Sequence, residues 1–377
     1  MEVRIGDSIE CNPTVKLVKG NEYPLIDIDK ISVGRKLVTN KDTIIYEKQS
    51  GCKFQNGDTL MARITPCLEN GKMAMASIPD KGIGSTELFV FRGKKGITDN
   101  DFVYYFLKQS YIRNLAANSM TGASGRQRAD LKFIKKIKFD LPSLPIQQKI
   151  ASILSSYDRL IENNTRRIRL LEQMAENLYK EWFVRFRFPE HENVEMVNGL
   201  PKGWKVERIK ECVKRLHFGR TYKAKELSQD GEVIVIDQST SDFLGFHNNA
   251  PDHHATFNSP IILFGDHSCK FCLMTRDFSL GENIIPFISK DTKQIDNYYL
   301  YFATHKLIVT EEYKRHWGRL SSMKILIPTI NIQQKFNKLI IKNEKMKKLL
   351  FIQNQLLTRQ RDLLLPRLMS GKLEVKS

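Results

Sequence analysis

The sequence predicts an α+β protein with two mixed α/β domains joined by two long helices that pair as an antiparallel coiled coil. Three observations support this fold class. The chain has 377 residues and is 41% hydrophobic, enough for two cores, because single cores rarely grow beyond about 250 residues. The second half repeats motifs of the first half in the same order. Each half also runs into a long stretch with apolar residues at helical spacing.

The repeat is clearest at an offset of 186 residues, where LPSLPIQQKI (141–150) matches IPTINIQQKF (327–336). The match extends backward, with LKFIKKIKFDLP (131–142) over WGRLSSMKILIP (317–328). Two weaker pairs come earlier in the same order: DFVYYFLKQS (101–110) with NYYLYFATHK (297–306), and GSTELFVFRG (84–93) with SLGENIIPFI (279–288). Ordered matches of this kind indicate a duplicated unit, here a pseudo-twofold internal repeat of about half the chain.

Each copy is expected to begin with short strands. GDTLMAR (57–63) and ELFVFRG (87–93) are short apolar runs bounded by turn-forming residues, which is typical of strands in a mixed sheet. The stretch 101–117 has helical spacing. Each domain should therefore combine a sheet with at least one helix.

A long helix is expected over 146–186, because Pro142 and Pro145 permit a helix to start there and no Pro or Gly follows before Pro189. Its seam positions advance in steps of four and three, as in a coiled coil: Tyr157, Ile161, Asn164, Ile168, Leu171, Ala175, Leu178 and Trp182.

A second long helix is expected over 332–366. Its stripe is interrupted by Gln353 and Gln360 and comprises Phe336, Leu339, Met346, Leu350, Leu357 and Leu364. Stripes of matching length can bury each other, and a helix of about 40 residues spans roughly 60 Å, so the pair would hold the domains at a fixed distance. The alternative is that each helix packs on its own domain. The expected division is a first domain (1–144), a central helix (145–188), a second domain (189–328) and a C-terminal helix (329–377).

Charge and cysteine content limit the class of protein. The 60 Lys and Arg exceed the 42 Asp and Glu, so the formal net charge is +18, which favours a polyanionic partner such as nucleic acid. The alternative is a basic surface that serves only solubility. No signal pattern or membrane-spanning apolar run is present, and the six cysteines have no disulfide-framework spacing. These features predict a cytoplasmic protein without a membrane partner.

Motifs for catalysis are missing. The Gly-Lys pairs are not followed by the Ser or Thr that a nucleotide-binding P-loop needs. Asn12-Pro13-Thr14 is only a partial match to an amino-methyltransferase motif, and Asp80 with Glu87 lacks the following Glu-x-Lys of a metal-dependent nuclease. A fused nuclease or methyltransferase is therefore the weaker hypothesis, and no catalytic residue is expected.

One segment has zinc-like spacing. Cys269 and Cys272 lie near His253, His254 and His267, which could complete the four ligands of a structural zinc site. The same segment is equally consistent with a strand that carries buried thiols. No metal site is predicted.

A family resemblance appears at the segment LPSLPIQQKIASILSSYDRLIENNTRRIRLLEQMAENLYKEWFVRF (141–186), followed by GLPKGWKVERIKE (199–211). Together they resemble the central region of specificity subunits of type I restriction-modification systems. GDTLMARITPCLENGK (57–72) and MTGASGRQRADLKFIKKIKFDLP (120–142) resemble the same family, and the likeness covers nearly the whole chain. The chain departs from the family pattern in that its N-terminus lacks the Pro-Lys-Gly-Trp lead-in found at 201–204. The second domain also lacks a close copy of GASGRQR.

The resemblance implies that each domain is a target-recognition domain for one half of an interrupted double-stranded DNA site, with the helices as the spacer. It implies that the helices dock methyltransferase subunits, expected to number two, and that restriction (translocase) subunits join the complex. S-adenosylmethionine, ATP and Mg²⁺ are then expected only in those partners, with no cofactor in this chain. The alternative is a stand-alone DNA-binding or coiled-coil scaffold protein without restriction partners.

The strongest candidate for contact with DNA is the loop around Ser124, Arg126, Gln127 and Arg128. Arginine can form paired hydrogen bonds with guanine, and glutamine can do so with adenine; the alternative is a solvated basic turn. A second cluster in the first domain comprises Arg63, Glu69, Asn70 and Lys72. Candidates in the second domain are Arg220, Tyr222, Lys223, Lys225, Lys270, Arg276 and Arg319. Many of these side chains are expected to contact phosphates rather than bases.

Overall fold

The structure is a computed structural model that describes residues 2–39, 42–122, 127–239, 241–309 and 314–375. The chain forms two compact units. Unit 1 consists of Met1–Arg166 and Ile352–Ser377, and unit 2 consists of Arg167–Phe351. The two long helices contribute residues to both units.

Unit 1 contains two sheets and a two-stranded ribbon. The larger sheet has the order β2 (Ile9–Cys11), β10 (Leu88–Gly93), β7 (Thr59–Ala62), β8 (Met73–Ala76) and β4 (Leu37–Val38). The smaller sheet has the order β5 (Thr43–Ile45), β3 (Glu22–Ile26), β9 (Lys81–Gly84) and β6 (Cys52–Gln55). The ribbon pairs β1 (Glu2–Arg4) with β11 (Lys138–Asp140). The described residues of the unit also form the short α-helices α1 (Ile5–Ser8), α2 (Asn100–Lys108), α3 (Ser110–Asn118) and α4 (Leu131–Lys136).

The central strand β10 has apolar residues on both faces because both faces are covered. Phe89 and Phe91 belong to the core that includes α2, whereas Leu88 and Val90 belong to the core shared with the smaller sheet. The helical stretch expected over 101–117 is divided into α2 and α3, because Gln109 has an extended backbone between them.

Unit 2 repeats most of this plan, without counterparts of β4 and β6 among its described residues. The order β15 (Val213–Arg215), β21 (Ile284–Ser289), β18 (Ile261–Gly265), β19 (Phe271–Met274) corresponds to β2, β10, β7, β8. The order β17 (Gly245–His247), β16 (Val233–Ile236), β20 (Phe278–Leu280) corresponds to β5, β3, β9, including the parallel pair. The ribbon is β14 (Lys205–Arg208) with β22 (Lys324–Ile327), and β12 (Met196–Val197) pairs with β13 (Leu200–Pro201). The helices are α6 (Ile209–Cys212), α7 (Asn297–Thr304) and α8 (Trp317–Ser322).

Two buried glutamines from the repeated IQQK motif make the same three hydrogen bonds in each unit. Gln147 accepts from the Asp99 N–H at 3.0 Å and donates to the carbonyls of Ile97 and Pro142 at 2.9 and 2.8 Å. Gln333 accepts from the Asp296 N–H at 2.8 Å and donates to the carbonyls of Gln294 and Pro328 at 2.9 and 2.8 Å. The sequence repeat is therefore a structural repeat.

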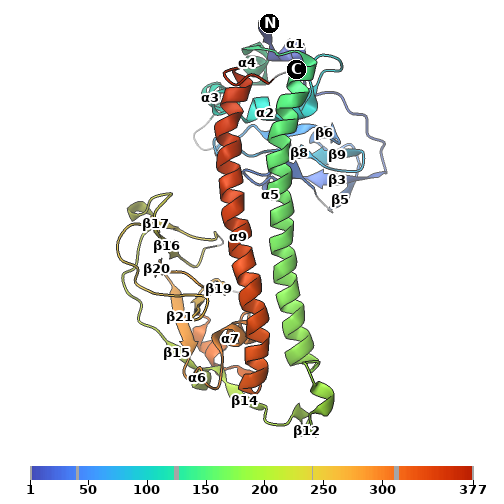
Figure 1. The fold of residues 1–377 in the computed structure, drawn as a ribbon. Helices are drawn as coiled ribbons and strands as arrows, with labels where there is room; N and C mark the ends of the chain where they lie inside the picture. The colour runs from blue at the N-terminus through green and yellow to red at the C-terminus, as the bar shows by residue number, and fades with distance from the viewer. Residues whose placement is uncertain (1, 40–41, 123–126, 240, 310–313, 376–377) are drawn as a thin grey trace. The chain divides into compact units, whose positions relative to one another are not determined.

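The long helices are α5 (Leu144–Tyr179), which continues into the π-helical turn η2 (Lys180–Val184), and α9 (Ile330–Met369) (Figure 1). Pro145 lies in the first turn of α5, where its missing N–H costs no helical hydrogen bond. No described helix is apolar over a length sufficient to cross a bilayer.

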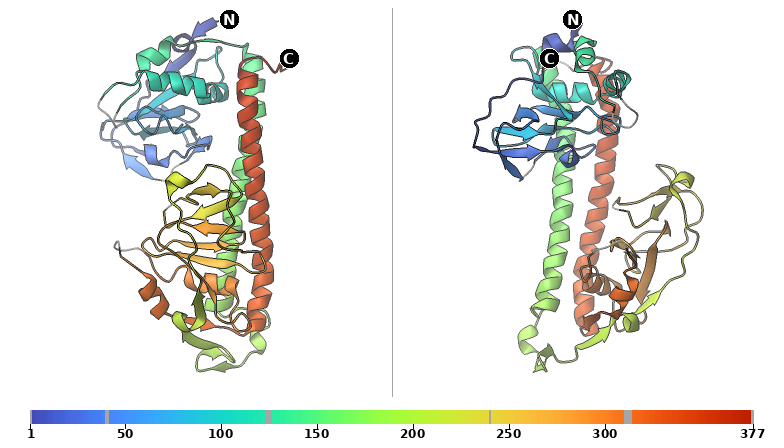
Figure 2. Two further views of the ribbon diagram at one scale, coloured as in Figure 1. Left: turned by 90° about the vertical axis from the view of Figure 1, so that its left-hand side faces the viewer. Right: turned by 180° about the vertical axis from the view of Figure 1, so that it is seen from behind.

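In unit 1, the first part of α5 lies beside the last part of α9, as both views of Figure 2 show. A buried ion pair joins them between Asp158 and Arg361, at 2.5 Å, and the Tyr105 hydroxyl donates to the other oxygen of Asp158. Nearly two turns further along α5, the Asn164 amide donates to Gln353 and Asn354, both at 3.0 Å. The helix pairing in this unit thus combines apolar and polar side chains.

In unit 2, the last part of α5 pairs with the first part of α9. Lys347 bonds Glu172 at 3.3 Å and Glu344 at 3.0 Å, and Leu350 is buried. Met346, predicted in this seam, is 41% exposed, so that prediction is wrong for its side chain. Lys347 and Asn354 are half-buried and Arg361 is buried, and the three lie at heptad spacing along α9. Met346 was predicted because it is apolar, but it lies one position before Lys347.

Candidate nucleic-acid interface

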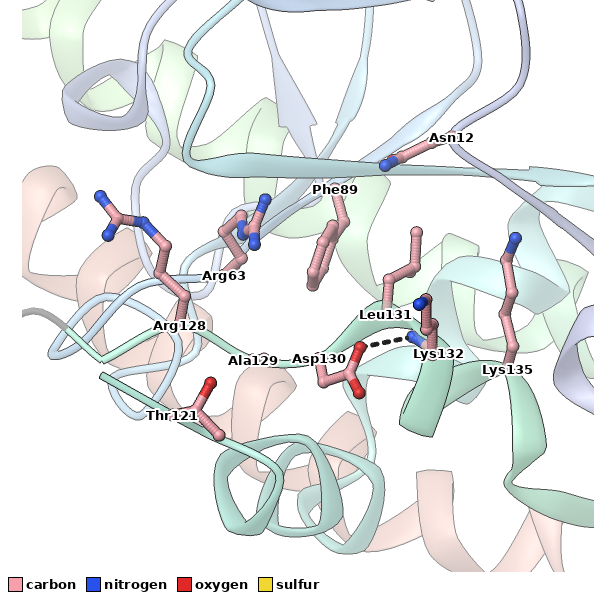
Figure 3. Close-up of a pocket in the computed structure, with 10 residues that line it drawn as sticks. All are labelled: Asn12, Arg63, Phe89, Thr121, Arg128, Ala129, Asp130, Leu131, Lys132 and Lys135. Carbon is pink, nitrogen blue, oxygen red and sulfur yellow. Dashed lines mark hydrogen bonds between the residues drawn. The ribbon is translucent and has the colours of Figure 1, made fainter.

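Unit 1 contains a basic recess of about 590 Å³ between the end of β7 and the start of α4 (Figure 3). We call it the first recess. Its positively charged side chains come from three segments that are distant in sequence: the residue after β7, the loop before α4, and α4 itself. The lining residues are Asn12, Arg63, Phe89, Thr121, Arg128, Ala129, Asp130, Leu131, Lys132 and Lys135.

Arg63 is fixed by its backbone and by an aromatic ring. Its N–H donates to the Glu87 carbonyl at 3.0 Å, and its own carbonyl accepts from the Ala129 N–H at 2.8 Å. Its guanidinium lies 4.9 Å from the centroid of the Phe89 ring, a cation–π distance. The Arg63 Nε is buried and has no hydrogen-bond partner among the described residues. Such a donor is costly unless a ligand satisfies it.

Arg128 is held by Glu87 instead of projecting freely. Its Nε and a terminal nitrogen contact the Glu87 carboxylate at 2.9 and 2.5 Å. The hydrogen bond from Arg128 lowers the pKa of Glu87, so the pair stays ionised at neutral pH. The charge of Arg128 is thus largely compensated, and its predicted contact with a base stays a prediction.

The other loop candidates are placed only in part. The Gln127 N–H donates to the Thr65 hydroxyl at 3.2 Å, and the Gln127 carbonyl accepts from the Thr65 N–H at 3.0 Å. These bonds join the loop to the turn that follows β7. Ser124 and Arg126 lie outside the described residues.

The predicted cluster after Arg63 divides in two. Glu69 and Asn70 are exposed on the turn, but the Lys72 ammonium donates to the Ile28 carbonyl at 3.1 Å and is held within the domain. Two lysines of the recess, Lys132 and Lys135, were not predicted. Their only sequence signal is the run LKFIKK, in which spacing does not show which lysines share a face with Arg63.

Several candidates in unit 2 have contacts within the protein. Tyr222 is buried and stacks on His247 with ring centroids 4.2 Å apart, so it is not presented at the surface. Arg220 lies over the Tyr222 ring and bonds Glu226 at 2.8 Å. Lys270 donates to the Asp237 carbonyl at 3.1 Å. The remaining candidates are exposed: Lys223, Lys225, Arg276 and Arg319. Arg276 also donates to a backbone carbonyl.

The zinc-like segment forms a strand edge. Cys272 lies in β19, and burial raises the pKa of its thiol, which disfavours the thiolate that binds zinc. The His253 ring stacks on Phe278. Within the described ranges, no group of three or more His, Cys, Asp or Glu side chains is arranged to hold a metal ion.

Unit 2 has a recess at the equivalent place, which we call the second recess. In the strand register, Ala62 pairs with Leu88 and Gly265 pairs with Ile284, so Asp266 occupies the position of Arg63. The second recess has a volume of about 360 Å³ and is lined by Arg215, Phe218, Thr221, Asp266, Glu282, Asn283, Ile285 and Arg315. One fold therefore presents different side chains at matched positions, which is the arrangement expected of two readers with separate specificities.

These features define an internally duplicated, basic protein with a recess at the matched position of each copy. A family model for the type I restriction modification DNA specificity domain matches residues 2–173 and again residues 201–361. The chain belongs to this family. It is accordingly a DNA-recognition subunit rather than a catalytic one, and the expected family and fold class are confirmed.

Two curated relatives come from Methanocaldococcus jannaschii. The type I restriction enzyme MjaIX specificity subunit is 27% identical over 325 residues, covering 75% of this chain and 71% of the relative. The putative MjaX specificity subunit is 22% identical and covers 94% and 88%, respectively. A solved S subunit of a type I restriction-modification system from M. genitalium has a similar fold, with a TM-score of 0.59 at 15% identity over 98% of this chain and 96% of that chain.

Proposed function

We propose that this subunit recognises a bipartite, interrupted DNA target, with one half read by each unit. The observation that carries the proposal is the matched pair of recesses, because equivalent positions in one fold hold Arg63 in the first copy and Asp266 in the second. A cation at this position attracts the DNA backbone, whereas Asp266 accepts from two backbone N–H groups of its own unit. Two copies of one fold that differ at matched positions are expected to contact their half-sites differently.

The proposal assigns residues 1–144 and 189–328 to target recognition and residues 145–188 and 329–377 to the spacer. The spacer helices would set the length of the unread gap and dock two methyltransferase subunits, with restriction subunits joining them. S-adenosylmethionine, ATP and Mg²⁺ would bind in those partners, in the cytoplasm, and not in this chain. The names of the relatives, which are specificity subunits of restriction enzymes, support these assignments.

The test is a gel-shift titration of the purified chain, alone and with methyltransferase subunits, on duplexes selected from a random pool and on scrambled controls. Specific affinities typically exceed non-specific ones by at least about 10³, so the selected duplex should compete that much better. Equal competition by scrambled DNA would favour the scaffold alternative. Methylation or cleavage by the chain alone would favour a catalytic one.

A further inference from the structure

We infer that the first recess is a phosphate-binding site that anchors the DNA backbone beside the half-site read by unit 1, with Lys132, Lys135 and Arg63 as its cations. The inference rests on the proposed function in that DNA is the ligand. It adds a division of labour, because it makes this recess a backbone anchor and not a base reader. It also adds an asymmetry, because the second recess lacks the same charge.

The charge balance of the first recess favours an anion. Lys132 and Lys135 are exposed and form no ion pair with any described residue, and Arg63 keeps an unsatisfied buried Nε. Asp130 is the only carboxylate among the lining residues, and it is engaged in accepting the Lys132 N–H at 2.8 Å, where it caps α4. Arg128 is already paired with Glu87. Apart from that paired arginine, the lining residues carry three cations, Arg63, Lys132 and Lys135, against one carboxylate, Asp130, so the recess keeps an excess of positive charge.

The geometry distinguishes a phosphate from a base edge. Arg63 follows the end of β7, whereas Lys132 and Lys135 lie on α4 (Figure 3), so the three cations come from separate elements and do not form one planar fork. A phosphate presents oxygens in several directions and suits such a set of donors, whereas base recognition uses paired bonds in one plane. The two lysines of the recess fit phosphate binding, because a lysine ammonium binds as a point charge.

The second recess shows how the fold uses the same place differently. Asp266 accepts from the N–H groups of His316 and Trp317 at 3.1 and 2.8 Å, so it caps α8. Arg315 lies 4.0 Å from its other oxygen. In unit 1, Asp130 caps the equivalent helix α4 from within its own loop, and position 63 can therefore carry a cation. The first recess is basic because a cation, Arg63, stands where the second recess has the capping carboxylate Asp266. The second recess therefore has no net excess of charge.

The experiment compares the salt dependence of DNA binding for the wild-type chain and the double variant Lys132→Gln/Lys135→Gln. Each lost phosphate contact lowers the slope of log K against log salt by about 0.9, so the variant slope should fall by about 1.8. Between about 50 and 200 mM salt, the variant should then lose about 12-fold less affinity than the wild type. Its preference among bases of the first half-site should not change.

The matched control is Lys95→Gln/Lys136→Gln, which removes the same charge from exposed lysines outside the recess, one of them on α4. Its slope should change by less than about 0.5. Replacing single phosphates in the first half-site by neutral methylphosphonates should weaken wild-type binding at one or two positions. At those positions, the same replacement should reduce the DNA affinity of the double variant by much less than it reduces the affinity of the wild type.

Two results would overturn the inference. One is an unchanged slope in the double variant. The other is relaxed base choice in the first half-site, whatever the slope, which would make the recess a base reader. The salt dependence of binding can be measured on any duplex. A chain with no site preference would therefore refute the proposed function, while the slopes would still decide whether the recess binds phosphate.

Discussion

The two buried glutamines of the IQQK repeat give a matched pair of stability predictions. Gln147→Ala removes one accepted and two donated hydrogen bonds of 2.8 to 3.0 Å from a side chain with no exposed surface. At about 1 kcal/mol for each bond, unit 1 should lose about 3 kcal/mol of unfolding free energy. Gln333→Ala removes the same three bonds and should cost unit 2 a similar amount.

Hydrogen exchange followed by mass spectrometry is the suitable assay, because it reports local stability and does not need a two-state transition of the whole chain. Protection should fall in α2 for the first variant and in α7 for the second. The controls are Gln148→Ala and Gln334→Ala, since these neighbouring side chains are exposed and should change stability by less than about 0.5 kcal/mol. Equal loss of protection in both units from either buried variant would refute the reasoning.

Two further predictions concern unit 1. Arg361→Ala leaves Asp158 buried without its cation and should lower the unfolding free energy, measured by urea unfolding, by about 3–5 kcal/mol. The double variant Asp158→Leu/Arg361→Leu leaves no unpaired charge and should lower it much less. Equal losses in the two variants would contradict the role of the pair. Desolvation, followed by repulsion from Arg361, lowers the pKa of Lys108 from 10.5 to about 8. Below pH 8 the buried ammonium is charged and lowers the unfolding free energy by its full amount. This destabilisation disappears as the pH rises toward 10.5. Lys108→Met should therefore stabilise the unit by about 1–2 kcal/mol at pH 7, allowing for its partial exposure, and should remove the rise in stability between pH 8 and 10 in pH-dependent unfolding; a decrease at pH 7 would show that the ammonium is favourably placed.

Local sequence patterns predicted the parts of the fold that depend on local properties. The apolar runs at 57–63 and 87–93 contain β7 and β10, and the proline positions indicated the start of α5 to within two residues. The repeat was detectable because Gln147 and Gln333 perform the same structural task and lie in the same short motif. Such tasks constrain residues near each other in sequence.

Features that depend on distant partners were not predictable. Arg361 bonds Asp158, 203 positions away, and a polar residue in a helical stripe gives no sign of such a partner. The half-buried Lys347 is a similar case, because its partner Glu172 lies on the other long helix. Arg128 was selected for its loop and charge, but its carboxylate partner Glu87 lies on a strand end 41 positions earlier. The recess lysines became recognisable only when the fold placed them beside Arg63.

We propose that the two units read DNA independently and that the paired helices set the distance between the two half-sites. Inserting one heptad into each long helix, after Arg166 and after Phe351, keeps the seam in register and lengthens the spacer by about 10 Å. Binding sites selected from a random-sequence library should then show the same two half-sites with a gap about three base pairs longer, at about 3.4 Å per base pair. An unchanged gap, or altered half-site bases with the original gap, would contradict the account.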